Sequence, residues 1–305
     1  MIAMNRILVF IAASVATVAT GCAQTPVRTS TTGEPFSAIV LPALPQKLDF
    51  AGEAVPLEYF DVCESLQKEL LVTCYMHSRT FQTLLNTERY FSIIEPILAE
   101  NGIPDDFKYL CMAESGLNPE AVSYAGAGGL WQFMPQTGKE YGLIVESQID
   151  ERYNVEKSTR AACRYILDAY ERFGSWTLAA AAYNAGNAGV ARRLEVQGTD
   201  DYYDTFLPQE TLRYVFRILS LKIVCSDPEA YGFEFGEDDL FKPLDDYRYV
   251  SFSGRNIDWS EIAREYGTNY KMLRLLNPWI RAYEYANKSG ITLQVKIPGR
   301  NMRRR

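Results

Sequence analysis

A glutamate occupies a position at which a helical pattern calls for an apolar side chain. Phe107, Leu110, Cys111 and Glu114 recur at spacings of three and four residues, which places them on one face of a helix predicted over residues 104–115. Burial in apolar surroundings raises the pKa of a carboxyl group, and a raised pKa suits a proton donor that works near neutral pH. On this helix alone, however, the favoured interpretation is a glutamate at the helix end paired with an arginine.

The chain contains few of the residues that other catalytic mechanisms require. His77 is the only histidine, so a Ser-His-Asp or Cys-His arrangement would need it, and a histidine-rich metal site cannot form. We expect His77 on or near a helix surface. The glycines within residues 126–129 have no Gly-Lys-Ser/Thr continuation, and the cysteines form no CxxC pair, so neither a nucleotide loop nor a zinc or redox motif is visible. Carboxylate chemistry remains, and we expect no metal and no cofactor.

Four short motifs follow one another along the chain. They read ESGLNP from Glu114, SYAGAGGLWQFMP from Ser123, AYNAG from Ala182 and PQETLRY from Pro208. In this order and at this spacing they closely resemble the motifs of the lytic transglycosylases of glycoside hydrolase family 23. The pattern from about residue 56 to residue 225 looks most like the membrane-bound transglycosylase D type. The resemblance reverses the preference for a purely structural Glu114.

The resemblance implies a role for each matching residue. Glu114 matches the family's catalytic acid and base, and Tyr214 matches the tyrosine that positions the catalytic carboxyl. Residues that line the sugar-binding groove of the family are matched by Ser123, Gln132, Tyr183 and Asn184. For Tyr183, packing in the core beside a run of alanines is the structural alternative. Asn184 is harder to explain as a core residue, because a buried amide needs hydrogen-bond partners.

The implied reaction cleaves the β-1,4 bond between N-acetylmuramic acid and N-acetylglucosamine without hydrolysis and leaves a 1,6-anhydromuramoyl end. Two-carboxylate glycosidases need a second, suitably placed carboxylate in addition to the acid. The recognised motifs provide no dedicated second carboxylate, which agrees with a single residue that acts as acid and base. We expect Glu120 and Glu140 to be exposed, and Glu210 lies in a first helical turn, where negative charge is favourable. Two alternatives stay open: a goose-type muramidase that hydrolyses the same bond, and a non-catalytic scaffold that binds the cell wall.

The elements that must position these residues are helices. Over residues 56–227 apolar residues recur at helical spacing, with cap signals between the runs. One helix should follow the cap Asn154 and end at Gly174, and a later helix should open near Pro208. We therefore expect a mainly α fold, and the resemblance implies a lysozyme-like catalytic domain over residues 56–227.

The pattern changes after Cys225. We expect a linker over residues 228–243, where proline and glycine stand among acidic residues, and then a small module over residues 244–299. The order within the module should be strand, helix, helix, strand (βααβ). These four elements are predicted over residues 247–252, 258–266, 269–276 and 291–297.

The C-terminal module resembles a LysM glycan-binding module. The similarity rests on WSEIAREYGT from Trp259, LNP from Leu276 and VKIP from Val295. A Gly-Asp-Thr turn that is usual in such modules is replaced here by residues 254–258, and residues 279–290 form an insertion. Two interpretations stay open: the module binds glycan, or it is a structural unit that has lost its ligand.

The first residues are typical of a bacterial lipoprotein signal peptide, predicted over residues 1–22. An apolar run over residues 7–18 is too short to span a bilayer comfortably, and small residues ending in Gly21-Cys22 follow it. This end resembles a lipobox, although Ala19 stands where leucine is preferred, and plain secretion is the alternative. We expect a lipid anchor on Cys22, a flexible tether over residues 23–55, and a location in the cell envelope at the periplasmic face of the outer membrane.

The charge of the chain argues against one class of partner. A formal net charge of -7 leaves no electrostatic footprint for a nucleic-acid-binding protein. The basic tail over residues 300–305 is interpreted as a solvated terminus. The expected partners are the glycan strands of peptidoglycan and, through the lipid anchor, a membrane.

Overall fold

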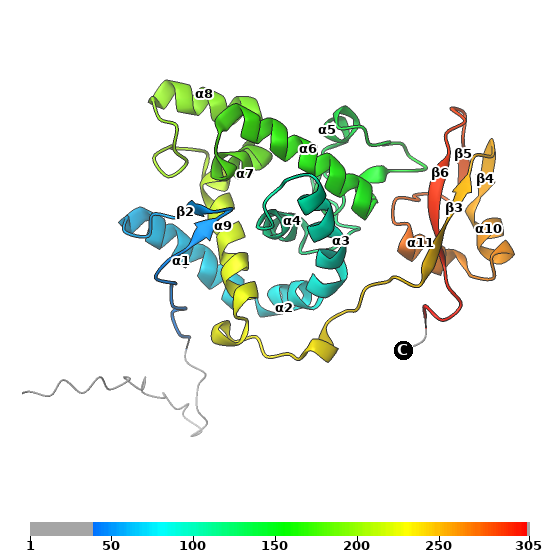
Figure 1. The fold of residues 1–305 in the computed structure, drawn as a ribbon, viewed down its shortest axis with the longest axis horizontal. Helices are drawn as coiled ribbons and strands as arrows, with labels where there is room; N and C mark the ends of the chain where they lie inside the picture. Colours follow the sequence, from blue (N-terminus) through cyan, green and yellow to red (C-terminus); the bar gives the residue numbers. More distant parts are fainter. Residues whose placement is uncertain (1–38, 304–305) are drawn as a thin grey trace, which may run out of the picture. The chain divides into compact units, whose positions relative to one another are not determined.

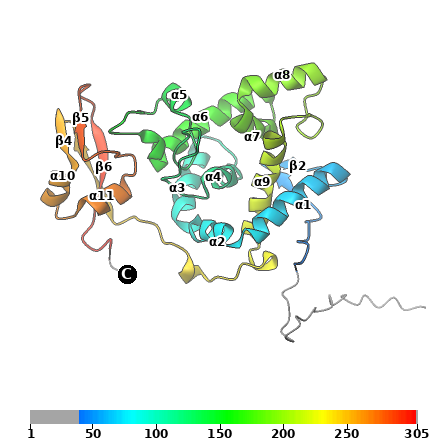
Figure 2. The same cartoon turned by 180° about the vertical axis from the view of Figure 1, so that it is seen from behind.

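A short helix, α4 (Phe107–Ser115), lies inside a ring of other helices in the first part of the chain (Figures 1 and 2). The computed structural model describes residues 39–303. The ring consists of α2 (His77–Leu85), α3 (Thr87–Glu100), α6 (Val155–Phe173), α7 (Trp176–Ala185) and α9 (Gln209–Ser226). Helices α3 and α9 pack directly against α4. The predicted mainly helical fold is therefore confirmed.

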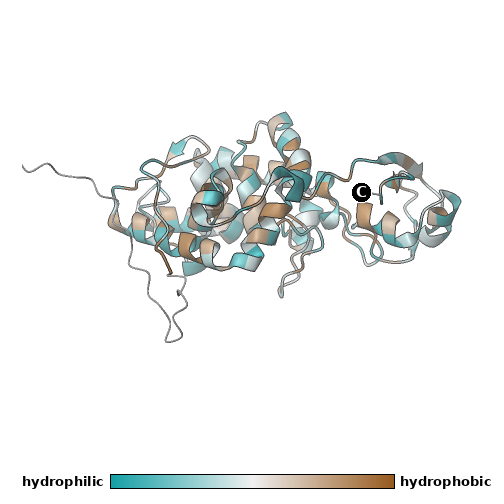
Figure 3. Cartoon of the chain, turned by 90° about the horizontal axis from the view of Figure 1, so that it is seen from below, coloured by the Kyte–Doolittle hydropathy of each residue, from teal (hydrophilic) through white to brown (hydrophobic). Residues whose placement is uncertain are grey.

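Shorter elements complete the helical part. Helix α1 (Phe60–Tyr75) packs along α9, and α8 (Asn187–Gln197) packs against α7. Helix α5 (Pro135–Glu140) and the 3-10 turn η1 (Glu151–Tyr153) lie between α4 and α6 in the chain. Figure 3 shows hydrophobic segments in brown and hydrophilic segments in teal interspersed along these helices, as expected when each helix buries one face.

Capping residues set the helix ends close to where the sequence predicts them. The side chain of Asn154 accepts a hydrogen bond from the amide of Lys157 and opens α6, which ends at Gly174 in a left-handed conformation. Ser175 caps α7 in the same way through the amide of Leu178. The helix predicted from residue 104 begins three residues later, at Phe107, because residues 104–106 form a turn ahead of it.

The end of the predicted tether is a folded hairpin, which corrects that prediction. Strands β1 (Asp49–Phe50) and β2 (Glu53–Ala54) pair in antiparallel fashion around a two-residue turn. Phe50 is fully buried, with its ring 5.2 Å from that of Phe107. The carboxylate of Glu53 accepts hydrogen bonds from the amides of Trp176 and Thr177 at the start of α7. One aromatic residue among polar ones is too weak a pattern to predict such an anchor.

The predicted linker also packs against the helical part. It contains two 3-10 turns, η2 (Glu229–Tyr231) and η3 (Glu237–Asp239). Phe233 is buried near Phe81, and the amide of Phe241 donates a hydrogen bond to the carbonyl of Leu85 in α2. His77 lies exposed at the start of α2, as expected.

The C-terminal unit contains the predicted βααβ order and one additional pair of strands. Strand β3 (Tyr247–Phe252) pairs antiparallel with β6 (Leu293–Pro298), with Val250 opposite Val295. Between them lie α10 (Trp259–Glu265) and α11 (Tyr270–Leu276). The additional pair joins β4 (Asn256–Asp258) to β5 (Glu284–Ala286), which lies in the inserted segment. Strands of three residues carry too little periodicity to be predicted.

The core of the C-terminal unit extends into the helical part. Its buried residues include Trp259, Trp279 and Ile280, and they pack with Ile149 and Tyr153 from the segment before α6. An isolated bridge pairs Ile149 with Ile280. The unit that the sequence marks as separate is therefore docked on the segment that leads into α6.

Several predictions fall on residues that the structure does not describe. The signal peptide, the lipidation site Cys22 and residues 23–38 of the tether lie before residue 39, and the end of the basic tail lies after residue 303. Within residues 39–303 no helix combines the length and the apolar character that a bilayer span requires.

Candidate active site

Glu114 is the last residue but one of α4, which stops at Gly116 with a left-handed φ of 61°. Its side chain is half-buried, between the buried Ala113 and the partly exposed Ser115. The hydroxyl of Tyr214, on α9, donates a hydrogen bond to Oε1 of Glu114. Only 2% of Tyr214 is exposed, so core packing holds the donor in place. The structure therefore brings these two predicted site residues into direct contact.

The surroundings of Glu114 change its acidity. Burial raises the pKa of its carboxyl from 4.5 to about 7. The hydrogen bond from Tyr214 and the charge of Arg217 lower this pKa and offset part of the effect, whereas the charge of Glu210 raises it. A carboxyl group with a pKa near 7 is present in both protonation states at neutral pH, so it can first donate a proton and later accept one.

Tyr183 and Asn184 lie near the end of α7. The hydroxyl of Tyr183 donates a hydrogen bond of 2.8 Å to the carbonyl of Trp131. Burial raises the pKa of Tyr183 well above its ordinary value, and the negative charge of Glu114 adds to the shift. Oδ1 of Asn184 accepts a hydrogen bond of 2.9 Å from Oγ1 of Thr211 in α9. Asn184 is exposed, and its amide nitrogen has no hydrogen-bond partner within residues 39–303.

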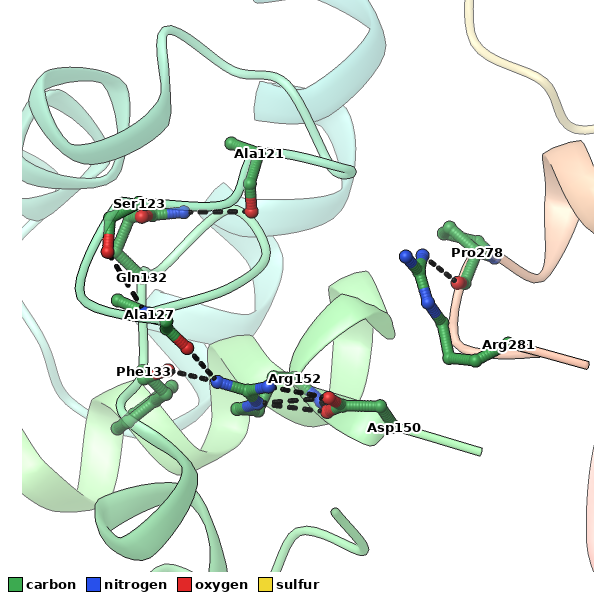
Figure 4. A network of polar contacts seen from close by, with 10 residues as sticks. Ala121, Ser123, Ala127, Gln132, Phe133, Asp150, Arg152, Pro278 and Arg281 are labelled. Atoms are coloured by element: carbon green, nitrogen blue, oxygen red, sulfur yellow. Dashed lines mark hydrogen bonds and ion pairs between the residues drawn. The ribbon is translucent and has the colours of Figure 1, made fainter. Parts of the chain in front are cut away.

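Ser123 and Gln132 lie on one loop, residues 121–133, which we call the groove loop (Figure 4). Nε2 of Gln132 donates to the carbonyls of Ala121 and Gly129, at 3.1 and 2.7 Å. Oγ of Ser123 accepts a hydrogen bond of 3.0 Å from the amide of Ala127. Within residues 39–303 neither side chain is hydrogen-bonded to Glu114. Both side chains therefore form hydrogen bonds within the loop and help to fix its shape.

The groove loop packs tightly on the segment before α6. Gly129 has a φ of 80°, and a Cβ there would lie 1.9 Å from the carbonyl oxygen of Arg152. A Cβ on Gly128 would lie 2.7 Å from the hydroxyl oxygen of Tyr153. Gln132 also has a left-handed backbone, with a φ of 48°, which is uncommon for a residue with a side chain. These glycines are required by packing between protein segments.

One charged group near the carboxyl, Arg217, was not predicted from the sequence. Arg217, one helical turn after Tyr214, lies close enough to influence Glu114 and contacts the buried Glu69 at 3.8 Å. Arg213 holds the same Glu69 at 2.6 Å. The signal available in the sequence was the spacing of Arg217 from Tyr214, because residues three apart on a helix share a face.

The described residues offer no metal site of the usual kind. Within residues 39–303 no three His, Cys, Asp or Glu side chains gather closely enough to hold an ion. The cysteines in this range are all free thiols, at positions 63, 74, 111, 163 and 225. Burial raises the pKa of Cys111, the thiol nearest to Glu114 in the sequence, well above its ordinary value.

Two family models match the chain. Residues 91–206 match the transglycosylase SLT domain, and residues 248–301 match the C-terminal LysM-like domain of soluble lytic transglycosylases. The first range covers α4, the groove loop and the motif that contains Tyr183. The helical part of the chain therefore contains a transglycosylase SLT domain, and the C-terminal unit is a LysM-like domain. Both resemblances predicted from the motifs are confirmed.

Individual relatives agree with the family models. Membrane-bound lytic murein transglycosylase D of Escherichia coli K12 is 29% identical over 223 residues, which cover 72% of this chain and 48% of that protein. The protein of the same name from E. coli O6:H1 matches equally well. The chain thus spans about half the length of these curated relatives. The chain is also similar to an inactive mutant of the lytic transglycosylase Slt from Pseudomonas aeruginosa, solved by X-ray crystallography, at 22% identity over 50% of this chain and 26% of that chain, with a TM-score of 0.36.

Proposed function

We propose that this chain cleaves the glycan strands of peptidoglycan as a lytic transglycosylase, with Glu114 as its acid and base. The observation that carries the proposal is the half-buried carboxyl of Glu114, which has a pKa near 7 and accepts a hydrogen bond from Tyr214. The SLT domain and the relatives named lytic murein transglycosylases support the same class of reaction.

One carboxyl group can serve both steps of this reaction. Protonated Glu114 would donate its proton to the bridging oxygen as the β-1,4 bond breaks, while the substrate's own N-acetyl group stabilises the positive charge at the anomeric carbon. The resulting carboxylate would then take the proton of the muramoyl 6-hydroxyl, whose oxygen bonds to that carbon. An attacking group on the same sugar has a large effective concentration and can compete with water.

The carboxylate of Glu210, whose charge acts on Glu114, has a different use. Glu210 is the acid whose charge has the largest effect on Glu114, but it is exposed and lies 3.1 Å from Arg217 in an ion pair. A retaining glycosidase needs a nucleophilic carboxylate about 5 Å from the acid on the opposite face of the sugar. Because Glu210 is exposed and already paired with Arg217, we assign it no catalytic role. The substrate's own hydroxyl is the nucleophile in our proposal.

The groove residues would recognise the sugar rings. We assign this role to Ser123, Gln132, Tyr183 and Asn184. Asn184 uses its carbonyl oxygen within the protein and so presents an NH₂ group, which can donate to the carbonyl of an N-acetyl group. Gln132 uses its NH₂ group within the groove loop and so presents its carbonyl oxygen to a sugar hydroxyl. The LysM-like domain would add a second contact to N-acetylglucosamine-containing chains.

Product analysis in heavy-oxygen water tests the reaction. Purified peptidoglycan would be digested in water labelled with ¹⁸O, and the released muropeptides would be weighed by mass spectrometry. We expect anhydro-ended products that are one water lighter than hydrolysis products and contain no solvent oxygen. Products with one labelled oxygen at a free reducing end would identify a muramidase, and binding without release of products would identify a scaffold.

We also propose that the chain is a lipoprotein of the cell envelope, anchored through Cys22 at the periplasmic face of the outer membrane. The support is the sequence Gly21-Cys22 after a short apolar run. Cys22→Ser should move the protein from the membrane fraction to the soluble fraction. A Cys22→Ser protein that still fractionates with membranes would remove the support for this anchor.

A further inference from the structure

One buried arginine, Arg152, forms hydrogen bonds to the backbone of the groove loop. Nη1 of Arg152 donates hydrogen bonds to the carbonyls of Gly126 and Phe133, at 2.8 and 2.9 Å (Figure 4). These two carbonyls lie on either side of Gln132 and Gly129, whose backbones are left-handed. A left-handed backbone at a residue with a side chain persists only where the surroundings enforce it. Arg152 supplies part of that constraint.

Asp150 fixes this arginine in turn. Nη2 of Arg152 lies 2.7 Å from Oδ2 of Asp150, and Nε lies 3.0 Å from Oδ1. Both side chains are 8% exposed. Removing one partner of a buried pair leaves an uncompensated charge in apolar surroundings. The orientation of Arg152, and with it the position of the groove loop, therefore depends on Asp150.

The C-terminal domain forms backbone hydrogen bonds with the segment that contains Asp150. The amide of Asp150 donates a hydrogen bond of 2.8 Å to the carbonyl of Trp279, and the amide of Arg281 donates one of 2.9 Å to the carbonyl of Gln148. Ile149, between them, is fully buried in the core of that domain. The segment is thus bound on one side by the LysM-like domain and on the other by the groove loop.

A second contact reaches the start of the groove loop. Oε1 of Glu120 lies 2.9 Å from Nη1 of Arg274 and 3.6 Å from Nη1 of Arg281. Glu120 directly precedes Ala121, whose carbonyl accepts a hydrogen bond from Gln132. Arg281 also covers the ring of Tyr153 at 4.2 Å from its centroid. The LysM-like domain therefore contacts both Glu120, which precedes the groove loop, and the segment before α6 on which that loop packs.

We propose that the LysM-like domain is a structural part of the glycan groove, and that Asp150 and Arg152 are positioning residues that transmit its docking to the loop with Ser123 and Gln132. The kinetic effects that we expect from this arrangement rest on the proposed function of Glu114. This structural role differs from a role in wall attachment, because it requires the domain to affect cleavage of substrates that need no attachment. A misplacement of about 1 Å in a positioned group can lower a rate on the order of 10²-fold.

The kinetic test uses the full-length protein and short soluble glycan chains. Arg152→Gln should lower kcat on the order of 10²-fold, because the loop loses both carbonyl contacts. Arg152→Lys should restore only part of the rate, because an ammonium group keeps the charge but cannot reproduce the planar geometry of the guanidinium. Arg281→Ala, in the C-terminal domain, should cause a smaller loss in the same direction. Arg255→Ala is the matched control, because Arg255 is exposed in the same domain and its guanidinium has no hydrogen bond or ion pair within residues 39–303.

Hydrogen exchange provides a test that does not depend on turnover. Amides of residues 126–133 should exchange faster in Arg152→Gln and in Arg281→Ala than in the wild type, and at the wild-type rate in Arg255→Ala. Unchanged exchange and unchanged kcat in Arg281→Ala, with weaker binding to sacculi alone, would overturn the inference. If the wild type cleaves no glycan, the proposed function fails, and the exchange rates still decide whether the domain holds the loop. Arg281→Ala keeps this decision available if Arg152→Gln does not fold.

Discussion

The hydroxyl of Tyr214 donates a hydrogen bond to Oε1 of Glu114, across 100 positions of the sequence. The donor is fixed in the core by α9, and the acceptor stands at the end of α4. This bond favours the ionised carboxylate, whereas burial favours the neutral acid, and burial has the larger effect. The result is a carboxyl group with a fixed orientation and a pKa near neutrality.

Glu114→Gln should abolish most turnover and leave the fold intact. Glutamine has nearly the same shape but cannot donate or take a proton at the glycosidic bond. General acid catalysis contributes about 10²- to 10⁴-fold, so the rate of muropeptide release should fall by at least that factor. Circular dichroism should show an unchanged helical spectrum. A variant with a near-wild-type rate would remove Glu114 from the reaction.

The same substitution should change how stability depends on pH. The pKa of Glu114 is raised from 4.5 to about 7 in the folded protein, so between these values the folded state binds the proton more tightly than the unfolded chain. The stabilisation from this proton is complete below pH 4.5 and is lost as the pH rises through about 7. Glutamine loses no proton, so the stability of Glu114→Gln relative to the wild type should increase by about 3 kcal/mol as the pH rises between these limits. Urea denaturation at several pH values measures the difference, and a difference independent of pH would contradict the raised pKa.

Tyr214→Phe should lower activity and move its pH dependence. The hydrogen bond lowers the pKa of Glu114, so its loss should raise that pKa and shift the alkaline limb of kcat/KM to higher pH. Loss of a hydrogen bond to a charged group costs about 1.5–3 kcal/mol, which corresponds to a rate loss of about 10- to 10²-fold. Tyr231→Phe is the matched control, because its hydroxyl donates to the backbone carbonyl of Ala43. An unchanged pH profile in Tyr214→Phe would show that the bond does not tune the acid.

The parts of the site that could be predicted are those that depend on local sequence patterns. The cap residue Asn154 opens α6 where expected, because capping depends on neighbouring amides only. The polar residue on an apolar helical face draws attention to Glu114, and the family resemblance is needed to predict a catalytic role for it. Tyr214 required the family resemblance, since no local pattern pairs residues on two distant helices.

The parts that could not be predicted depend on contacts between distant segments. Asp150 and Arg152 are ordinary residues ahead of a helix cap in the sequence, and their burial arises from the C-terminal domain and the groove loop. Phe50 gave no strand pattern, yet it is buried against Phe107. Periodicity indicates which face of one element is buried, but it does not indicate which other element covers that face.

Gly129→Ala should separate the packing of the groove loop from the chemistry at Glu114. A Cβ at Gly129 would lie 1.9 Å from the carbonyl oxygen of Arg152, and its φ of 80° disfavours a side chain. The loop must therefore move, and the free energy of unfolding should fall by about 1–3 kcal/mol. Glycan cleavage should fall as well, because Ser123 and Gln132 move with the loop, while the pKa near 7 in the pH profile should remain.

Gly189→Ala is the matched control for this substitution. Gly189 lies within α8, where an added Cβ meets no atom within 4 Å, so alanine should raise the free energy of unfolding by about 0.5–1 kcal/mol and leave cleavage unchanged. Thermal denaturation and the initial rate of muropeptide release measure both effects. If Gly129→Ala matched Gly189→Ala in stability and rate, the groove loop would not be held against the backbone of Arg152, and the positioning of Ser123 and Gln132 would need another explanation.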